Sequence, residues 1–163
     1  MPVDLVREQI PAEEREILIH HLEQDTGAGK HYAHMLRQGV VLKEFAVFPL
    51  SAIGELTTFF KNIGTQTSIE AIGTEFFPLR SAYAAFRRAA ERHEEKSEKP
   101  DFQMIQKYIR EIGATETHGK VTAVQLRPGV FQLVDGNKSA IAAHEWARTS
   151  GRVDFHLRIY VIG

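Results

Sequence analysis

Apolar residues occur in short runs or at every second position in four stretches, and each stretch predicts a β-strand. The four stretches are residues 40–48, 120–126, 130–134 and 153–161. An Arg-Pro-Gly turn joins the second and third stretches, which predicts a hairpin. In the last stretch the polar residues share one face of the expected strand, and they are Asp154, His156, Arg158 and Tyr160.

Apolar residues at helical spacing predict helices in most of the remaining chain. The expected helices cover residues 4–24, 30–38, 52–63, 79–96, 100–113 and 140–150. The segment from Gly27 to Lys30 is interpreted as the loop that ends the first helix, because no strand precedes this glycine-rich fragment. The fold class is therefore α+β, with a small mixed β-sheet flanked by helices and with extra N-terminal helices.

Composition narrows the classes of protein that the chain can represent. The 163 residues are 43% hydrophobic and 25% charged, which is ordinary for a single globular domain. A net charge of −1 predicts no general attraction to nucleic acid or to an anionic membrane. No apolar run approaches the roughly 20 residues of a membrane span, and the N-terminus lacks the features of a signal peptide, so we expect a cytoplasmic protein.

Two kinds of chemistry lack the residues that they require. The chain has no cysteine, which excludes disulfides, thiolate metal ligands and a thiol nucleophile. His31 and His34 are at i, i+3, but the sequence offers them no recognisable third ligand, so we expect no metal site.

The junction between residues 130–134 and the alanine-rich helix carries the strongest chemical signal. The strand stops at Asp135-Gly136, and the helix follows after Asn137-Lys138-Ser139. A strand that turns sharply into a helix directs the first free backbone N–H groups of the helix toward one spot, which favours a phosphate or another anion. An alternative interpretation is purely structural: Asp135 or Asn137 caps the helix, and Gly136 supplies a positive φ.

The run from Phe131 to Lys138, followed by an alanine-rich helix, resembles the signature of the ParB/sulfiredoxin superfamily. That family carries a strand, then Asp-Gly-Asn-His-Arg or a close variant, then a helix whose N-terminus binds nucleotide or other phosphates. Asp135, Gly136 and Asn137 match the motif, whereas Lys138 and Ser139 stand where the family usually has histidine and arginine. The match covers mainly the C-terminal third of the chain.

The resemblance implies a single domain, 1–163, made of a helical extension at 1–39 and a ParB-like core at 40–163 with a helical insertion at about 65–113. It implies a phosphate- or nucleotide-binding protein, in which Gly136, Asn137, Lys138 and Ser139 hold the phosphates. If the protein is catalytic, ATP- or ADP-dependent phosphoryl transfer to a small molecule with Mg²⁺ is the implied reaction.

The residues that would perform this reaction come from two places in the sequence. The resemblance implies that Asp135 orients the turn, contacts Mg²⁺ or accepts a proton. In the free-serine kinases of the superfamily a glutamate after the first strand is the base, and Glu55 occupies a comparable position. Arg158 or His156 could supply the cation that is missing at Ser139, if the polar face of the last strand borders the turn.

Several functions remain open at this point. Sulfiredoxin activity is excluded because its cysteine is absent, and a DNA-binding helical domain is not expected after the motif in the 163 residues. A second interpretation is a non-catalytic interaction or regulatory module with a degenerate phosphate loop, whose extra helices bind a protein partner or a second copy. A third interpretation is a ParB-like nuclease, for which Arg87, Arg88 and Arg92 would have to form a basic patch.

Overall fold

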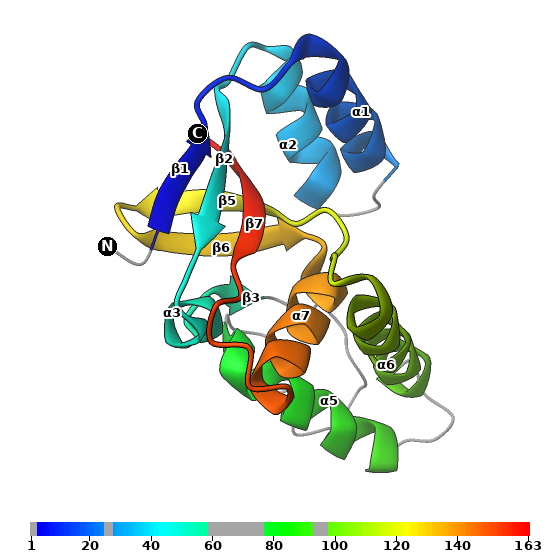
Figure 1. Ribbon diagram of the computed structural model, residues 1–163. Helices are drawn as coiled ribbons and strands as arrows, with labels where there is room; N and C mark the ends of the chain where they lie inside the picture. Colours follow the sequence, from blue (N-terminus) through cyan, green and yellow to red (C-terminus); the bar gives the residue numbers. More distant parts are fainter. Residues whose placement is uncertain (1–2, 25–27, 59–76, 93–97) are drawn as a thin grey trace.

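The computed structural model describes residues 3–24, 28–58, 77–92 and 98–163. Its strands form one mixed, seven-stranded sheet in the order β1-β2-β7-β5-β6-β3-β4 (Figure 1). The strands are β1 (Val3–Arg7), β2 (Leu42–Val47), β3 (Thr57–Thr58), β4 (Phe77–Pro78), β5 (Thr122–Arg127), β6 (Val130–Asp135) and β7 (Leu157–Ile162). The described helices are α1 (Ala12–Glu23), α2 (Ala28–Arg37), α3 (Leu50–Gly54), α5 (Leu79–Arg92), α6 (Glu98–Thr115) and α7 (Asn137–Thr149).

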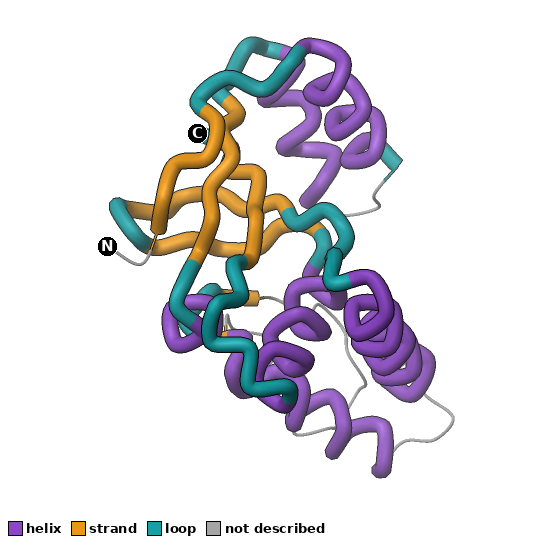
Figure 2. The backbone as a smooth tube through the Cα atoms, viewed as in Figure 1, coloured by secondary structure: helices purple, strands orange, loops and turns teal. Residues whose placement is uncertain are grey.

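The α+β class and the mixed sheet are confirmed, and the four expected strands all lie in the sheet. β5 and β6 pair as the predicted antiparallel hairpin, while β5 runs parallel to β7. The sheet curls strongly. The ring centroids of Phe45 on β2 and Phe131 on β6 lie only 5.7 Å apart, although two strands separate β2 from β6 in the sheet. In Figures 1 and 2 the β5–β6 hairpin accordingly crosses the direction of β2 and β7.

Two hydrophobic clusters cover the two faces of this curled sheet. The larger cluster joins the sheet to α5, α6 and α7, and α7 is its central helix, since all eight residues from Ala140 to Ala147 are buried. The four alanines in that run let the neighbouring helices approach closely. The smaller cluster joins α1 and α2 to the ends of β2 and β7 through residues such as Leu18, Leu36 and Ile162.

The structure corrects the predicted N-terminal half. Residues 4–7 belong to the edge strand β1, which pairs with β2, rather than to a helix. Residues 28–30 lie inside α2, so the fragment that was expected to be a loop continues as helix there; residues 25–27 lie outside the described part. The helical extension at 1–39 therefore contains a strand of the sheet.

Three further boundaries differ from the prediction. α3 ends at Gly54 and gives way to β3, so the helix expected at 52–63 is wrong over 57–58, and residues 59–76 lie outside the described part. α6 begins two residues before Pro100 and ends at Thr115. β7 begins only at Leu157, because residues 153–154 form a turn and residues 155–156 have no regular secondary structure, so Asp154 and His156 do not belong to its polar face.

A row of polar side chains crosses five neighbouring strands in direct register. Its members, one from each strand, are Arg7, Glu44, Tyr160, Thr122 and Asp135. Helix α1 lies over this row and contacts it through two residues: Glu14 binds Arg7 and Tyr160, and His21 binds Asp135. The row therefore connects the turn before α7 with the N-terminal strand of the sheet.

Candidate functional site

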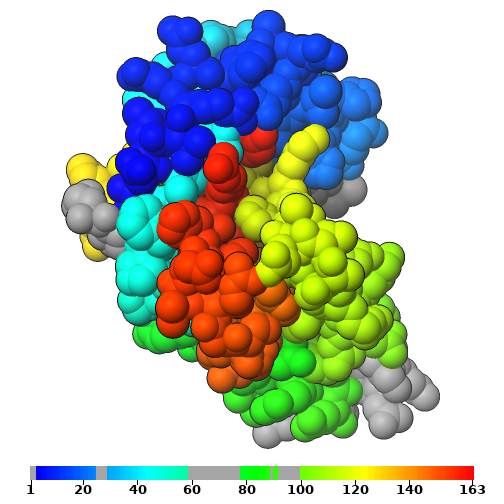
Figure 3. Space-filling model, viewed as in Figure 1, coloured from blue at the N-terminus to red at the C-terminus, as the bar shows by residue number. Residues whose placement is uncertain are grey.

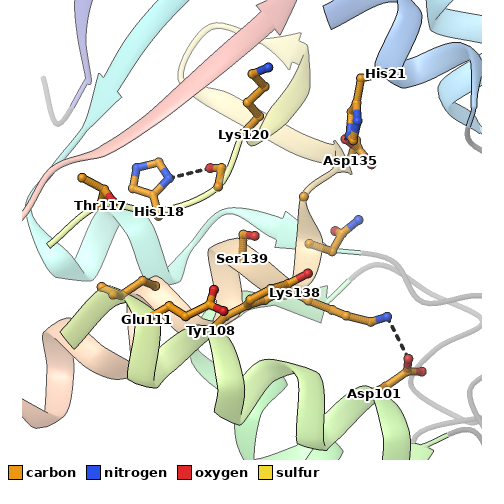
Figure 4. A pocket seen from close by; sticks show the side chains of 14 residues that line it. His21, Asp101, Tyr108, Glu111, Thr117, His118, Lys120, Asp135, Lys138 and Ser139 are labelled. Carbon is orange, nitrogen blue, oxygen red and sulfur yellow. Dashed lines mark hydrogen bonds and ion pairs between the residues drawn. The ribbon is translucent and has the colours of Figure 1, made fainter. Parts of the chain in front are cut away.

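A cleft of about 730 Å³ opens at the N-terminus of α7 (Figure 4). Four parts of the chain line it: the turn from β6 into α7, the segment before β5, the inner face of α6, and α1. The lining side chains include His21, Asp101, Tyr108, Glu111, His118, Lys120, Asp135, Asn137, Lys138 and Ser139. The structure thus brings the five predicted residues of the turn together in one concave surface.

Gly136 is essential to the shape of this cleft. Its φ of 76° and ψ of 23° lie in the left-handed region, and it occupies the N-cap position of α7, where glycine offers no side chain to cap the helix. A Cβ at this position would lie 2.2 Å from the carbonyl oxygen of Lys120 and 2.9 Å from the Cα of Val121. The positive φ was predicted, but the expected capping by Asp135 or Asn137 is wrong, since no side chain caps this helix.

The uncapped end leaves backbone donors at the cleft. The carbonyl of Gly136 accepts the first helical bond from Ala140, at 2.9 Å. The N–H groups of residues 137–139 precede that bond and have no carbonyl partner inside the helix. Together with the positive end of the helix dipole, they favour negative charge at this position.

Three side chains of the turn are held by contacts to other elements. The carboxylate of Asp135 lies 2.8 Å from Nε2 of His21, and the Lys138 ammonium lies 2.8 Å from the carboxylate of Asp101 on α6. The hydroxyl of the fully buried Thr58 donates to the side-chain oxygen of Asn137 at 2.5 Å. These contacts fix the turn between α1, β3 and α6.

Ser139 faces the segment that leads into β5. A Cβ on Gly119 would lie 2.8 Å from the Ser139 hydroxyl oxygen, so any larger residue at position 119 would require the Ser139 side chain to shift. Lys120 is exposed in the same segment, and in Figure 4 its side chain points toward the α1 side of the cleft. Lys120 thus adds a second ammonium group to the cleft beside Lys138.

His118 has a defined protonation pattern. Its Nδ1 lies 2.8 Å from the carbonyl oxygen of Gly119, so Nδ1 must carry the proton and donate it. Its Nε2 accepts the backbone N–H of Arg158 at 3.3 Å. Burial lowers the pKa of His118 below the usual 6.5, and the charge of Arg158 acts in the same direction. The imidazole is therefore neutral at pH 7.

The charges of the cleft are nearly balanced. Lys120 and Lys138 face the carboxylates of Asp101, Glu111 and Asp135. The described residues contain no group of three or more acidic or histidine side chains arranged to hold a metal ion. A metal at this cleft would therefore have to arrive with a ligand that supplies most of its coordination, as Mg²⁺ does with phosphates.

The structure places Glu55 outside the cleft. Glu55 follows α3, its side chain is exposed, and its carboxylate forms an ion pair with Arg80 of α5. Arg158 and His156 do not line this cleft either; they line a second cleft that shares the segment of residues 117–120. Of the site residues predicted from the sequence, those of the turn line the observed cleft and Glu55 does not.

Several lining residues were not identified from the sequence. His21, Asp101, Tyr108 and Glu111 come from helices whose place beside the turn is set only by tertiary packing. His118 and Lys120 had a detectable signal, because residues just before the first strand of a hairpin lie beside those just after the second strand. Arg87 and Arg88 are exposed on α5 and do not line the cleft.

No protein-family model, curated protein sequence or solved structure matches this chain. Among the described residues no helix is long and apolar enough to cross a membrane.

Proposed function

We propose that the protein binds a nucleotide or another phosphorylated small molecule at the N-terminus of α7, as a site of the ParB/sulfiredoxin type. The observation that carries the proposal is Gly136, whose left-handed backbone and close approach to Lys120 leave the start of α7 uncapped at the cleft. The volume of about 730 Å³ lies within the usual range for small-molecule sites.

The charges of the cleft favour a metal-complexed nucleotide over a bare one. Three carboxylates line the cleft beside two lysines, so a free polyphosphate would meet repulsion. Mg²⁺ lowers the charge of the polyphosphate and needs only one or two protein carboxylates. The backbone N–H groups of residues 137–139, with Lys138 and Lys120, would hold the phosphates, while the phosphate oxygens and water would supply most of the coordination of Mg²⁺.

Phosphoryl transfer to a small molecule is the catalytic form of this proposal. Such catalysis depends on positioning and on charge neutralisation, with a carboxylate to accept the proton of an acceptor hydroxyl. Asp135 fits this role better than Glu55, because Asp135 lies in the cleft and Glu55 is paired with Arg80 outside it. The Asp135→Asn variant should then retain Mg–ATP binding and lose turnover of ATP.

Thermal unfolding with Mg²⁺ and ATP, ADP or CTP tests binding directly. A nucleotide at about 100 times its Kd stabilises the fold by roughly 2.7 kcal/mol, which raises Tm by about 5–10 °C for a chain of this size. The shift should shrink strongly in Lys138→Ala and Lys120→Ala. It should persist in Lys30→Ala, which removes an exposed lysine of α2 outside the cleft. If none of the nucleotides changes Tm, the proposal is wrong.

A second function is favoured by one specific observation. The charged side chains of the turn have internal partners, since Lys138 pairs with Asp101 and Asp135 pairs with His21. These ion pairs join the turn to α1 and α6. A non-catalytic interaction module with a degenerate phosphate loop would retain them as a structural junction, because they hold these elements together. In that case the nucleotides leave Tm unchanged, and Lys138→Ala affects stability alone.

A further inference from the structure

A second cleft, of about 420 Å³, lies next to the first and shares with it the wall formed by residues 117–120. Its other walls come from β7 and from residues 152–156. Figure 3 shows this region of the surface, where the yellow segment leading into β5 meets the red C-terminal part of the chain. The cleft contains two arginines, one lysine and three carboxylates, and their pairing decides what it attracts.

The carboxylates of this cleft are held closely by arginines. Glu44 is buried, and its carboxylate lies 2.5 Å from Arg7. Glu116 and Asp154 both pair with Arg152, whose guanidinium also lies over the Trp146 ring, 5.3 Å from its centroid. Arg152 carries one positive charge against the two negative charges of Glu116 and Asp154, so the negative charge of the cleft is only partly neutralised before any ligand enters.

Arg158 is the exception among the paired arginines. Its closest approach to Glu44 is 3.3 Å, and in every other arginine–carboxylate ion pair of the described residues the two groups come closer than this. The Arg158 side chain is 61% exposed, so the rest of its planar fork faces the cleft and the solvent. Lys120, in the shared wall, has no ion-pair partner in the described part of the chain.

We propose that this second cleft binds a small organic monocarboxylate through Arg158 and Lys120. The Arg158 fork offers the bidentate geometry that a carboxylate matches, and Lys120 adds a point charge from the shared wall. Among the apolar residues that line the cleft, Phe155 retains some exposed surface for the body of the ligand, whereas Val121 and Ile159 are fully buried in the core.

Charge counting selects a monoanion over a phosphate dianion. The three basic side chains that line the cleft equal the three acidic ones in number, so a single negative charge is tolerated and a second one meets the nearby carboxylates. The neutral His118 in the shared wall adds no cation, since its two nitrogens are occupied by the carbonyl of Gly119 and the N–H of Arg158.

The test is an NMR titration of the ¹⁵N-labelled protein with benzoate and acetate, following the Arg158 Nε–H and the amides of residues 117–121. We expect saturable shifts in the millimolar range, with Kd raised at least tenfold in Arg158→Gln. Arg158→Lys keeps the charge and loses the fork, so its Kd should lie between the two. Arg37→Gln, which changes an exposed arginine on α2 outside both clefts, should leave Kd unchanged.

Two results would overturn the proposal. One is a linear, non-saturating shift, or a Kd that does not change in Arg158→Gln. The other is tighter saturation of the Arg158 Nε–H shift by inorganic phosphate than by benzoate, since Arg158 lines only the second cleft, and this would make it a dianion site. Lys120 lines both clefts, whereas Lys138 lines only the first. Benzoate binding should therefore persist in Lys138→Ala whether or not ATP binds to the first cleft, which separates a failure of this proposal from a failure of the nucleotide site.

Discussion

The Cα of Gly136 lies against the backbone of Lys120, so closely that a β-carbon on Gly136 would stand 2.2 Å from the Lys120 carbonyl oxygen. This contact joins the segment before β5, which borders both clefts, to the start of α7, which borders the first cleft, and sets the distance between them. Backbone cannot move aside as a flexible side chain can, so the contact requires glycine for two reasons, its positive φ and its lack of a Cβ.

We therefore expect Gly136→Ala to destabilise the fold by roughly 3 kcal/mol or more, because backbone strain and steric overlap add. Gly129→Ala is the matched control. Gly129 has nearly the same φ, 77°, but nothing lies within 4 Å of the place that its β-carbon would take, so only the conformational cost of about 1 kcal/mol applies. Urea unfolding of both variants measures the difference, and equal losses would show that the close approach is not present in solution.

The turn before α7 was predictable because its chemistry is local. Asp-Gly after an apolar run marks the end of a strand, and an alanine-rich segment marks the helix that follows. The cleft that surrounds the turn was not predictable, because its other walls come from distant parts of the chain. His21 and Asp135 are 114 residues apart, and no local pattern announces their contact.

The secondary structure of β1 likewise could not be predicted from the local sequence pattern. Its five residues, Val3–Arg7, are too few for a period of two to be told from a period of 3.6. Pairing with β2 makes this segment a strand, and the pairing places Arg7 beside the buried Glu44. In the same way Glu55 stands at a plausible distance along the chain from the first predicted strand, but the ion pair with Arg80 places it outside the cleft.

Protonation of two buried histidines should make the fold less stable in mild acid. Burial lowers the pKa of both His118 and His144 below the usual 6.5, so the unfolded chain binds protons first as the pH falls. The stability that the neutral rings provide is complete above about pH 6.5 and is lost as the pH falls from there toward the folded-state pKa values. Urea unfolding between pH 7.5 and 5 should show this decline.

The decline should become shallower in His118→Asn and in His144→Asn, since each variant removes one of the two titrating groups. His20→Asn is the control, because His20 is exposed on α1. A pH profile that is the same in all three variants as in the unchanged protein would assign the acid sensitivity to other groups.

Arg7 should be important for stability because it faces two carboxylates, those of Glu14 and the buried Glu44. Arg7→Met leaves these carboxylates without their main cation, and we expect a loss of about 2 kcal/mol, reduced from the fully buried case because Arg7 is partly exposed. The double variant Arg7→Met/Glu44→Gln should recover part of the loss. Arg37→Met, at an exposed pair of carboxylates, should have little effect on urea unfolding.

The pairing of Lys138 with Asp101 separates the two proposed functions. If the turn binds phosphates, Asp101 competes with the ligand for the Lys138 ammonium, so Asp101→Asn should tighten Mg–ATP binding. Both side chains are partly exposed, which limits the gain to less than about 1 kcal/mol, or about fivefold in Kd. Glu111→Gln removes the same charge from the same cleft without releasing Lys138, because Glu111 pairs with Lys107. Calorimetric titration of both variants with Mg–ATP therefore distinguishes the release of Lys138 from a general change of charge. Tighter binding in Asp101→Asn alone supports the phosphate site, whereas equally tighter binding in both variants indicates an effect of charge alone. Unchanged affinity in both variants favours the structural junction.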